Sequence, residues 1–300
     1  MKALFIGHTY VDITFVTDHI PEGDEKTVAR DYAVAFGGNA VTAAFACAKL
    51  GIVPDLLSTV ADDWLGRMFM DMALAYRIPV HARKVARSSL SFIMPNDGKR
   101  AIVRCRDDAY LHPFPMLNLD GCELLHLDGH QGDASIAYAR LARERGMLVS
   151  LDGGGVRSNT LELLPFVDVA IVSERFCEQL DRTAEGTLDL LREKGVKVGG
   201  VTQGERGLLW YEGEAPARRL AALQVPEERV IDTNGAGDLF HGAYVYARLS
   251  RPQQSWDFCF RFARAASAYG VQFLGNEARL PRVDDVFATA KAAGDVLPQT

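Results

Sequence analysis

The chain has little cysteine and no long hydrophobic run. Its 300 residues include 5 cysteines, which are scattered without Cys-x-x-Cys spacing. This pattern argues against a disulfide framework or a zinc site and predicts buried free thiols. No stretch stays apolar over the ~18 residues that a membrane helix needs, and the N-terminus lacks the features of a signal peptide. We therefore expect a cytoplasmic protein with no membrane partner.

Three common catalytic motifs are also missing. The chain has no GxxxxGK[ST] phosphate loop, no GxGxxG after a strand and no GxSxG nucleophile elbow. These absences exclude P-loop enzymes, dinucleotide enzymes of the Rossmann type and serine hydrolases with that elbow. Positive charge is not in excess either, since 33 Lys and Arg stand against 39 Asp and Glu, for a net charge of −6. We therefore expect no nucleic-acid partner, and an anionic ligand would need local donors.

Apolar runs of strand length alternate with helical patterns over most of the chain. This alternation predicts a single α/β domain, residues 1–300, with a mostly parallel central sheet covered by helices on both faces. The expected strands lie at residues 3–7, 123–128, 147–152, 167–172, 197–202 and 208–211, and the expected helices at about 40–50, 134–145, 174–181 and 184–194.

Two segments break this rhythm, at about residues 8–36 and 84–106. The first is polar and ends in a possible edge strand, while the second contains two β-rich runs around Pro95-Asn96-Asp97-Gly98. An Asp-Gly pair between such runs is typical of a β-hairpin. We expect the two segments to form a small β-sheet lid over one end of the central sheet.

Several polar residues follow predicted strands. Asp12, Asp128 and Asp152 would lie at the carboxyl ends of strands, which is where ligands bind in parallel sheets. His126, Asp128 and His130 alternate and would share one face of a strand. No further ligand cluster accompanies them, so we predict that Asp128 or His130 contacts a substrate and not that the three residues hold a metal.

Residues 230–249 read VIDTNGAGDLFHGAYVYARL. The pattern predicts a strand at Val230-Ile231, a glycine turn and then a helix. The first N–H groups of a helix attract an anion, and a phosphate would suit this turn. Asp238 would lie in the first helical turn, and the helix dipole predicts that it is a carboxylate at pH 7. Such a group would deprotonate a hydroxyl that attacks a phosphate. The residues alone leave open that Asp238 only caps the helix.

Four segments together carry a resemblance to a known family. They are Gly37-Gly38-Asn39, VTQGERG at 201–207, DTNGAGDLFHGA at 232–243 and a helix at 258–271. In order and spacing, over nearly the whole chain, they resemble the ribokinase-like (PfkB) carbohydrate kinases. The resemblance implies a three-layer α/β sandwich with a β-sheet lid that commonly meets a second lid in a homodimer. It also implies transfer of the γ-phosphoryl group of ATP, with Mg²⁺, to a hydroxymethyl group of a sugar.

The resemblance further implies roles for individual residues. Asp238 would be the catalytic base, and the backbone of Gly235, Ala236 and Gly237 would form an anion hole. The implied sugar contacts are Asp12, Gly38 and Asn39, and the implied nucleotide contacts are Thr202, Gly204, Gly207 and Arg264.

Within the family, the chain looks most similar to the ketohexokinase-like branch, which includes kinases of 6-deoxy-6-sulfofructose. Lys26, Thr42 and Ser173-Glu174 carry this likeness, and a lysine like Lys26 helps to hold the sulfonate in that branch. A ketose or ketose derivative is therefore the implied substrate. An arginine expected near His130 is missing, and Ser173 to Phe176 replace the family's Asn-x-x-Glu, so no metal ligands are implied.

Some alternatives stay open at this stage. Arg104 and Arg106 alternate on the hairpin, and they would either close over an anionic substrate or form a solvated face. A nucleoside kinase of the same family is a second interpretation, for which Phe36 and Tyr110 are the aromatic hints. A sugar or nucleotide sensor without turnover is a third. The sequence also leaves open whether K⁺ binds near Asp232.

Overall fold

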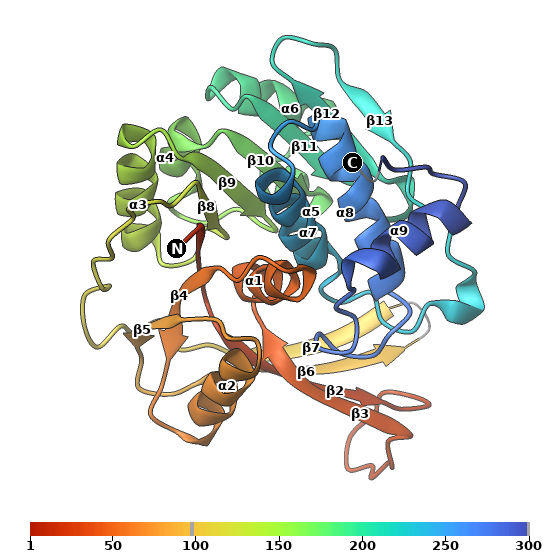
Figure 1. Cartoon of the computed structure of the whole chain (residues 1–300). Helices are drawn as coiled ribbons and strands as arrows, with labels where there is room; N and C mark the ends of the chain where they lie inside the picture. Colours follow the sequence, from red (N-terminus) through yellow and green to blue (C-terminus); the bar gives the residue numbers. More distant parts are fainter. Residues whose placement is uncertain (97–98, 299–300) are drawn as a thin grey trace.

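The computed structural model describes residues 1–96 and 99–298 and contains two sheets (Figure 1). In these residues the large sheet has nine strands in the order β13-β12-β11-β10-β9-β8-β1-β4-β5, of which those from β11 to β5 are parallel. β12 and β13 extend one edge in antiparallel pairing. The strands are β1 (Ala3–Gly7), β4 (Asp55–Val60), β5 (Val80–Lys84), β8 (Leu124–Leu127), β9 (Leu148–Gly153), β10 (Val169–Ser173), β11 (Val198–Thr202), β12 (Leu208–Glu212) and β13 (Arg218–Leu220).

Helices cover both faces of the large sheet, because its strands are apolar on both sides. In β1, Ala3 and Phe5 belong to one buried core, whereas Leu4 and Ile6 belong to the other. The first core is completed by α1 (Asn39–Leu50), α2 (Trp64–Ala75), α7 (Ala236–Ser250), α8 (Trp256–Gly270) and α9 (Val283–Ala292). The second core is completed by α3 (Gly132–Glu144), α4 (Thr160–Leu163), α5 (Glu174–Gln179) and α6 (Ala184–Glu193). The predicted α/β architecture is therefore confirmed.

One predicted strand is wrong. Val230 and Ile231 lie in an irregular segment before α7, and Ile231 is half exposed. The N–H groups of Ile231 and Asp232 both donate to the carbonyl of Val271, which follows α8, at 2.9 and 3.2 Å. This segment therefore bonds to one carbonyl beyond α8 and not to a neighbouring strand, which is why it is not the strand that Val230-Ile231 had suggested.

The second sheet is the lid. Its strands are β2 (Tyr10–Val16), β3 (Asp31–Gly37), β6 (Ser89–Asn96) and β7 (Lys99–Cys105), in the order β3-β2-β6-β7. β2 and β6 are parallel, and the two outer pairs are antiparallel. β6 and β7 form the predicted hairpin, while the predicted turn residues Asp97 and Gly98 lie outside the described residues.

The two faces of the lid differ in chemistry. Because paired residues point to the same side of a sheet, each row across the strands belongs to one face. One row consists of Ala35, Asp12, Ser91 and Arg104, and the next consists of Val34, Ile13, Phe92 and Val103. We call the face that carries Asp12 the inner face and the face that carries Val103 the outer face.

The cysteine prediction needs one correction. Four of the five cysteines are buried, but Cys105 is exposed. It is paired with Leu90 at the end of β7, where strand alternation turns its side chain to the outer face of the lid. In the part of the chain that the structure describes, no helix is long and apolar enough to span a membrane.

Candidate active site

The site lies where the order of the large sheet reverses. The chain leaves β1 for β4 and β5 on one side and returns to β8 on the other, so the carboxyl end of β1 is a topological switch point. Such points are the usual ligand sites of open α/β sheets. Asp128 directly follows β8, Asp152 lies near the end of β9, and α1 begins beside them.

The glycine turn before α7 has the geometry that an anion site requires. Gly235 is the N-cap residue and has φ 76°, a left-handed conformation that favours glycine. The N–H of Ala236 makes only a long hydrogen bond of 3.4 Å to the carbonyl of Thr233. A Cβ built on Gly237 would meet no atom within 4 Å, so the backbone there is open to a ligand. Asp238 lies in the first turn of α7, as predicted from the sequence.

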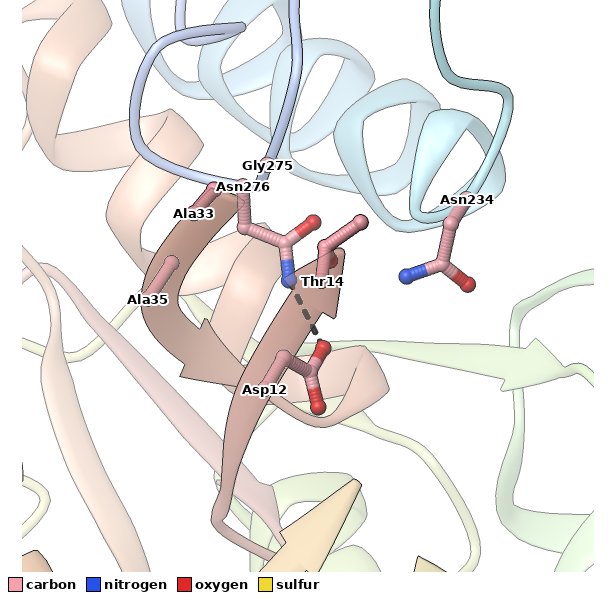
Figure 2. A pocket seen from close by; sticks show the side chains of 7 residues that line it. All are labelled: Asp12, Thr14, Ala33, Ala35, Asn234, Gly275 and Asn276. Carbon is pink, nitrogen blue, oxygen red and sulfur yellow. Dashed lines mark hydrogen bonds between the residues drawn. The ribbon is translucent and has the colours of Figure 1, made fainter. Parts of the chain in front are cut away.

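Asp12 reaches the site from the inner face of the lid. Figure 2 shows its carboxylate in a small pocket with Thr14 and Asn276, and the amide nitrogen of Asn276 donates to Oδ2 of Asp12 at 3.0 Å. The same nitrogen donates to the carbonyl of Phe36 at 2.8 Å. Gly37 is paired with Tyr10 on the same face, and a Cβ on Gly37 would approach the Asp12 carboxylate to 2.3 Å, so a larger residue there would displace this carboxylate.

Asn39 points to a buried carboxylate. It is the first residue of α1, and Gly38 is the N-cap residue, with φ 103°. The Asn39 side chain donates to Oδ2 of Asp152 at 3.2 Å. On the other side of Asp152, Nε2 of His241 lies 3.6 Å from Oδ1. Burial lowers the pKa of His241 to about 3, so this imidazole is neutral near pH 7.

Asp128 supports the start of α1. Its Oδ2 accepts the N–H of Ala40 at 3.2 Å, and its Oδ1 accepts the N–H of His130 at 2.9 Å. Burial alone would raise the pKa of Asp128, but the charge and the hydrogen bonds of His130, together with the charge of Arg157, outweigh burial and hold the pKa well below its usual range. Asp128 is therefore ionised, and the N–H groups of Ala40 and His130 already occupy some of its lone pairs.

The other three carboxyls of the site have raised pKa values. Burial and the negative charges of Asp152 and Asp12 raise the pKa of Asp238 to about 8. Burial also raises the pKa of Asp152, against the hydrogen bond from Asn39. For Asp12, burial outweighs the lowering by Ser91, Arg104 and Asn276, and the pKa is about 6. The prediction that Asp238 is a full carboxylate at pH 7 is thus wrong for the ligand-free protein, because burial and neighbouring carboxyls exceed the helix dipole.

The residues expected at the nucleotide lie at the end of β11, in the turn that follows it and in the middle of α8. Thr202 ends β11, and its hydroxyl donates to the carbonyl of Val172 at 3.2 Å. Gly204 and Gly207 bound the turn to β12, with φ values of 54° and 89°. Arg264 on α8 donates to the carbonyl of Ala221 at 2.6 Å and forms an ion pair with Asp295.

The expected cations of the lid differ in position. Arg104 shares the inner face with Asp12, and its guanidinium lies 5.5 Å from the centre of the Tyr10 ring. Arg106 forms an ion pair with Asp108 at 2.9 Å. Lys26 is exposed in the loop between β2 and β3 and has no ion pair or hydrogen bond within the described residues. Residues 1–96 and 99–298 contain no cluster of three His, Cys, Asp or Glu side chains that would hold a metal.

Three residues of the site were not expected from the sequence. Asn276 and Arg279 come from the loop between α8 and α9, which carries no motif, and Asn276 meets Asp12 across 264 positions of the chain. His241 follows Asp238 by three residues, so helical spacing could have indicated a shared face. Arg279 is fully buried, and its Nη2 donates to Oδ2 of Asp232 at 2.5 Å.

Comparison with known proteins shows the family to which the chain belongs. The family model for the pfkB family carbohydrate kinases matches residues 1–281. A ribokinase of Haemophilus influenzae is 23% identical over 92% of this chain and 94% of its own length. A nucleoside kinase of Methanothermobacter thermautotrophicus is 25% identical over 93% of this chain and 92% of its own.

Solved structures show the same fold. A putative ribokinase from Agrobacterium tumefaciens superposes with a TM-score of 0.86 over 98% of this chain and 97% of that chain, at 23% identity. The ribokinase of Arabidopsis thaliana complexed with ribose and ATP has a TM-score of 0.79 over 97% of this chain and 98% of its own, at 24% identity. Together with the family match over 281 residues, these likenesses show that the chain belongs to the pfkB family of carbohydrate kinases, which are phosphotransferases with an alcohol group as acceptor.

Proposed function

We propose that the protein is an ATP-dependent sugar kinase that phosphorylates a hydroxymethyl group of a ketose or ketose derivative. The observation that carries the proposal is the position of Asp238. It directly follows an open glycine turn at the N-terminus of α7 and interacts electrostatically with the carboxyls of Asp12 and Asp152. A phosphoryl group on the turn and a hydroxyl between the carboxyls would therefore meet at Asp238.

Each group has a defined task in this mechanism. Asp12 and Asn39 bind sugar hydroxyls, because a carboxylate accepts hydrogen bonds and an amide both donates and accepts them. Asp238 orients the primary hydroxyl in line with the γ-phosphorus and accepts its proton as the new P–O bond forms and the bond from the γ-phosphorus to the leaving ADP breaks. The N–H groups of the Gly235–Gly237 turn stabilise the charge on the transferring oxygens. The raised pKa of Asp238 brings this base near the working pH, where proton transfer is most efficient.

The proposal also includes contacts for the nucleotide and a metal ion. We propose that ATP contacts Thr202, Gly204, Gly207 and Arg264. When bound, Mg²⁺ would neutralise charge on the β- and γ-phosphates. The described residues offer no cage for it, and Glu174, where the family has part of its metal motif, is paired with Arg206. Mg²⁺ commonly binds through substrate phosphates with few protein ligands, so the residues present fit a metal that arrives with ATP.

Two lid features support further parts of the proposal. Arg104 lies on the inner face and Lys26 in an adjoining loop, and both would attract an anionic group on the sugar, such as a sulfonate or phosphate. The outer face exposes Tyr32 and Val103 by 63% and 66%. We propose that a second copy of the chain covers this outer face in a homodimer, since a β-sheet with one apolar exposed face is rarely left open to water.

A nucleoside kinase is the second candidate, because a nucleoside kinase is among the similar proteins. The aromatic hints do not favour it. Phe36 is fully buried and stacks on Phe45 at 3.6 Å, and the Tyr110 ring is covered by Arg83 at 3.5 Å. Phe36 therefore offers no free face to a base, and one face of the Tyr110 ring is already taken by Arg83.

An ADP-release assay over ketohexoses, sulfofructose, aldopentoses, keto-deoxy acids and nucleosides tests the proposal. We expect turnover with a ketose or its anionic derivative. Asp238→Asn should lower kcat by about 10²–10⁴-fold. Asp284→Asn is a matched control, since Asp284 is an exposed acid in the first turn of α9. Near-normal turnover of Asp238→Asn would refute the mechanism, and silence with every acceptor would favour a sensor.

A further inference from the structure

Arg279 is a buried cation beside the glycine turn. Its side chain is 0% exposed, its Nε donates to the carbonyl of Gly275 at 3.0 Å, and its Nη2 donates to Asp232 at 2.5 Å. Its Nη1 is also buried but has no hydrogen-bond partner among residues 1–96 and 99–298. A Cβ built on Gly235 would lie 3.6 Å from this nitrogen. Because buried donors are rarely left unpaired, this N–H points to a ligand that binds at the turn.

Three of the roughly four lone-pair positions on Asp232, the partner of Arg279, are used within the chain. Oδ1 of Asp232 accepts the N–H of Asn234 at 2.8 Å, and Oδ2 accepts the N–H of Gly275 at 3.2 Å as well as Arg279. A guanidinium is always protonated in proteins, so the charge of Asp232 is neutralised from within the chain. A monovalent ion at Asp232 would compete for the same oxygens and lie against a like charge. The donor set therefore does not fit K⁺.

We propose that Arg279 is the fixed cation of the anion hole and that the kinase works without K⁺. This inference rests on the proposed function. A positive charge held beside the turn stabilises the negative charge that collects there during transfer, and a dry environment strengthens the effect. The charge also acts on the carboxyls of Asp238 and Asp12, which otherwise repel an anionic nucleotide. Through its unpaired Nη1, Arg279 would donate directly to the anion that binds at the turn.

The first experiment needs no variant. ADP release by the wild-type protein is measured in chloride salts of K⁺, Na⁺ and tetramethylammonium at equal ionic strength, together with the thermal midpoint in each salt. We expect rates within about twofold of each other and equal thermal midpoints. Arg279 already pairs with Asp232, so K⁺ would not bind there and would not stabilise the folded protein. Stimulation by K⁺ of about tenfold, or a midpoint raised by K⁺ alone, would overturn the inference. Silence with every acceptor in every salt would instead refute the proposed function, and the midpoints would still report on the cation site.

The second experiment separates charge from folding. Arg279→Met keeps the length of the side chain, and we expect kcat to fall about 10²-fold, with a smaller change in KM for the sugar. Guanidinium or K⁺ added to this variant should recover part of the loss, and Arg279→Lys should retain more activity than Arg279→Met. Since Arg279→Met leaves Asp232 unpaired, the double variant Asp232→Asn/Arg279→Met removes both charges. We expect it to regain thermal stability but not kcat, and recovery of wild-type kcat would show that Arg279 is only structural.

Discussion

Asn276 joins the lid to the glycine turn, and its replacement tests how the lid positions Asp12. Its amide nitrogen donates to Asp12 and to the carbonyl of Phe36, and its Oδ1 would lie 2.7 Å from a Cβ on Gly235. Asn276→Ala removes both hydrogen bonds from a buried position. One bond to a charged group and one to a neutral group are together worth about 2–4 kcal/mol. We therefore expect the free energy of unfolding in urea to fall by about this amount.

The effect on Asp12 is more specific. The pKa of Asp12 is about 6, and the hydrogen bond from Asn276 lowers it. Loss of a bond worth about 1.5–3 kcal/mol to the ionised form corresponds to about one to two pH units, since 1.36 kcal/mol is one unit of pKa. Wild-type affinity for the sugar should weaken below about pH 6, and affinity of Asn276→Ala should already weaken below about pH 7–8. Calorimetric titration with sugar in the absence of ATP measures both curves.

Two further variants make this test sharp. Asn276→Asp keeps the shape of the side chain but places a like charge against Asp12, so it should weaken binding more than Asn276→Ala near pH 8. Asn118→Ala serves as the control, because Asn118 is exposed and, in the described part of the chain, its side chain bonds to the neighbouring Asp120. If the pH profiles of Asn276→Ala and the wild-type protein overlay, or if Asn118→Ala shifts equally, the role given to Asn276 is wrong.

Three other predictions concern the buried carboxyls, the lid and the dimer. A carboxyl whose pKa is higher in the folded than in the unfolded protein lowers stability as pH rises. The raised pKa of Asp238 therefore predicts that the thermal midpoint falls between about pH 5 and 8. Over the same range kcat/KM should rise, because the base becomes ionised. Asp238→Asn should flatten the fall, and an unchanged slope would contradict this. Gly37→Ala should weaken sugar binding at least about tenfold, since its Cβ would displace the Asp12 carboxylate; unchanged affinity in the same titration would refute the steric argument. Val103→Glu should give monomers in light scattering, whereas Val296→Glu, which changes a valine that is also exposed but lies near the C-terminus, should not; a wild-type monomer would exclude the dimer.

Local sequence patterns predicted most of the helices and strands. The expected strands at 123–128 and 197–202 agree with β8 and β11, because buried parallel strands are short apolar runs bounded by glycine or polar residues. The expected helix at 40–50 agrees with α1 for a similar reason, since small and apolar residues on nearly every face suit a buried helix. Val230-Ile231 failed because an apolar pair is too short for a periodicity, and its hydrogen-bond partner lies beyond α8.

The sequence by itself determined the elements of the site that are local in the chain: the glycine turn, the first helical turn that holds Asp238, and Asp128 at the end of a strand. The protonation of these groups and their partners in space depend on the tertiary structure. Asp238 departs from the protonation that its helix position suggests, because Asp12 and Asp152 come from distant segments and burial adds to their repulsion. The pairing of Arg279 with Asp232 likewise could not be read from a pattern, since such contacts depend on how a loop without a motif packs against the turn.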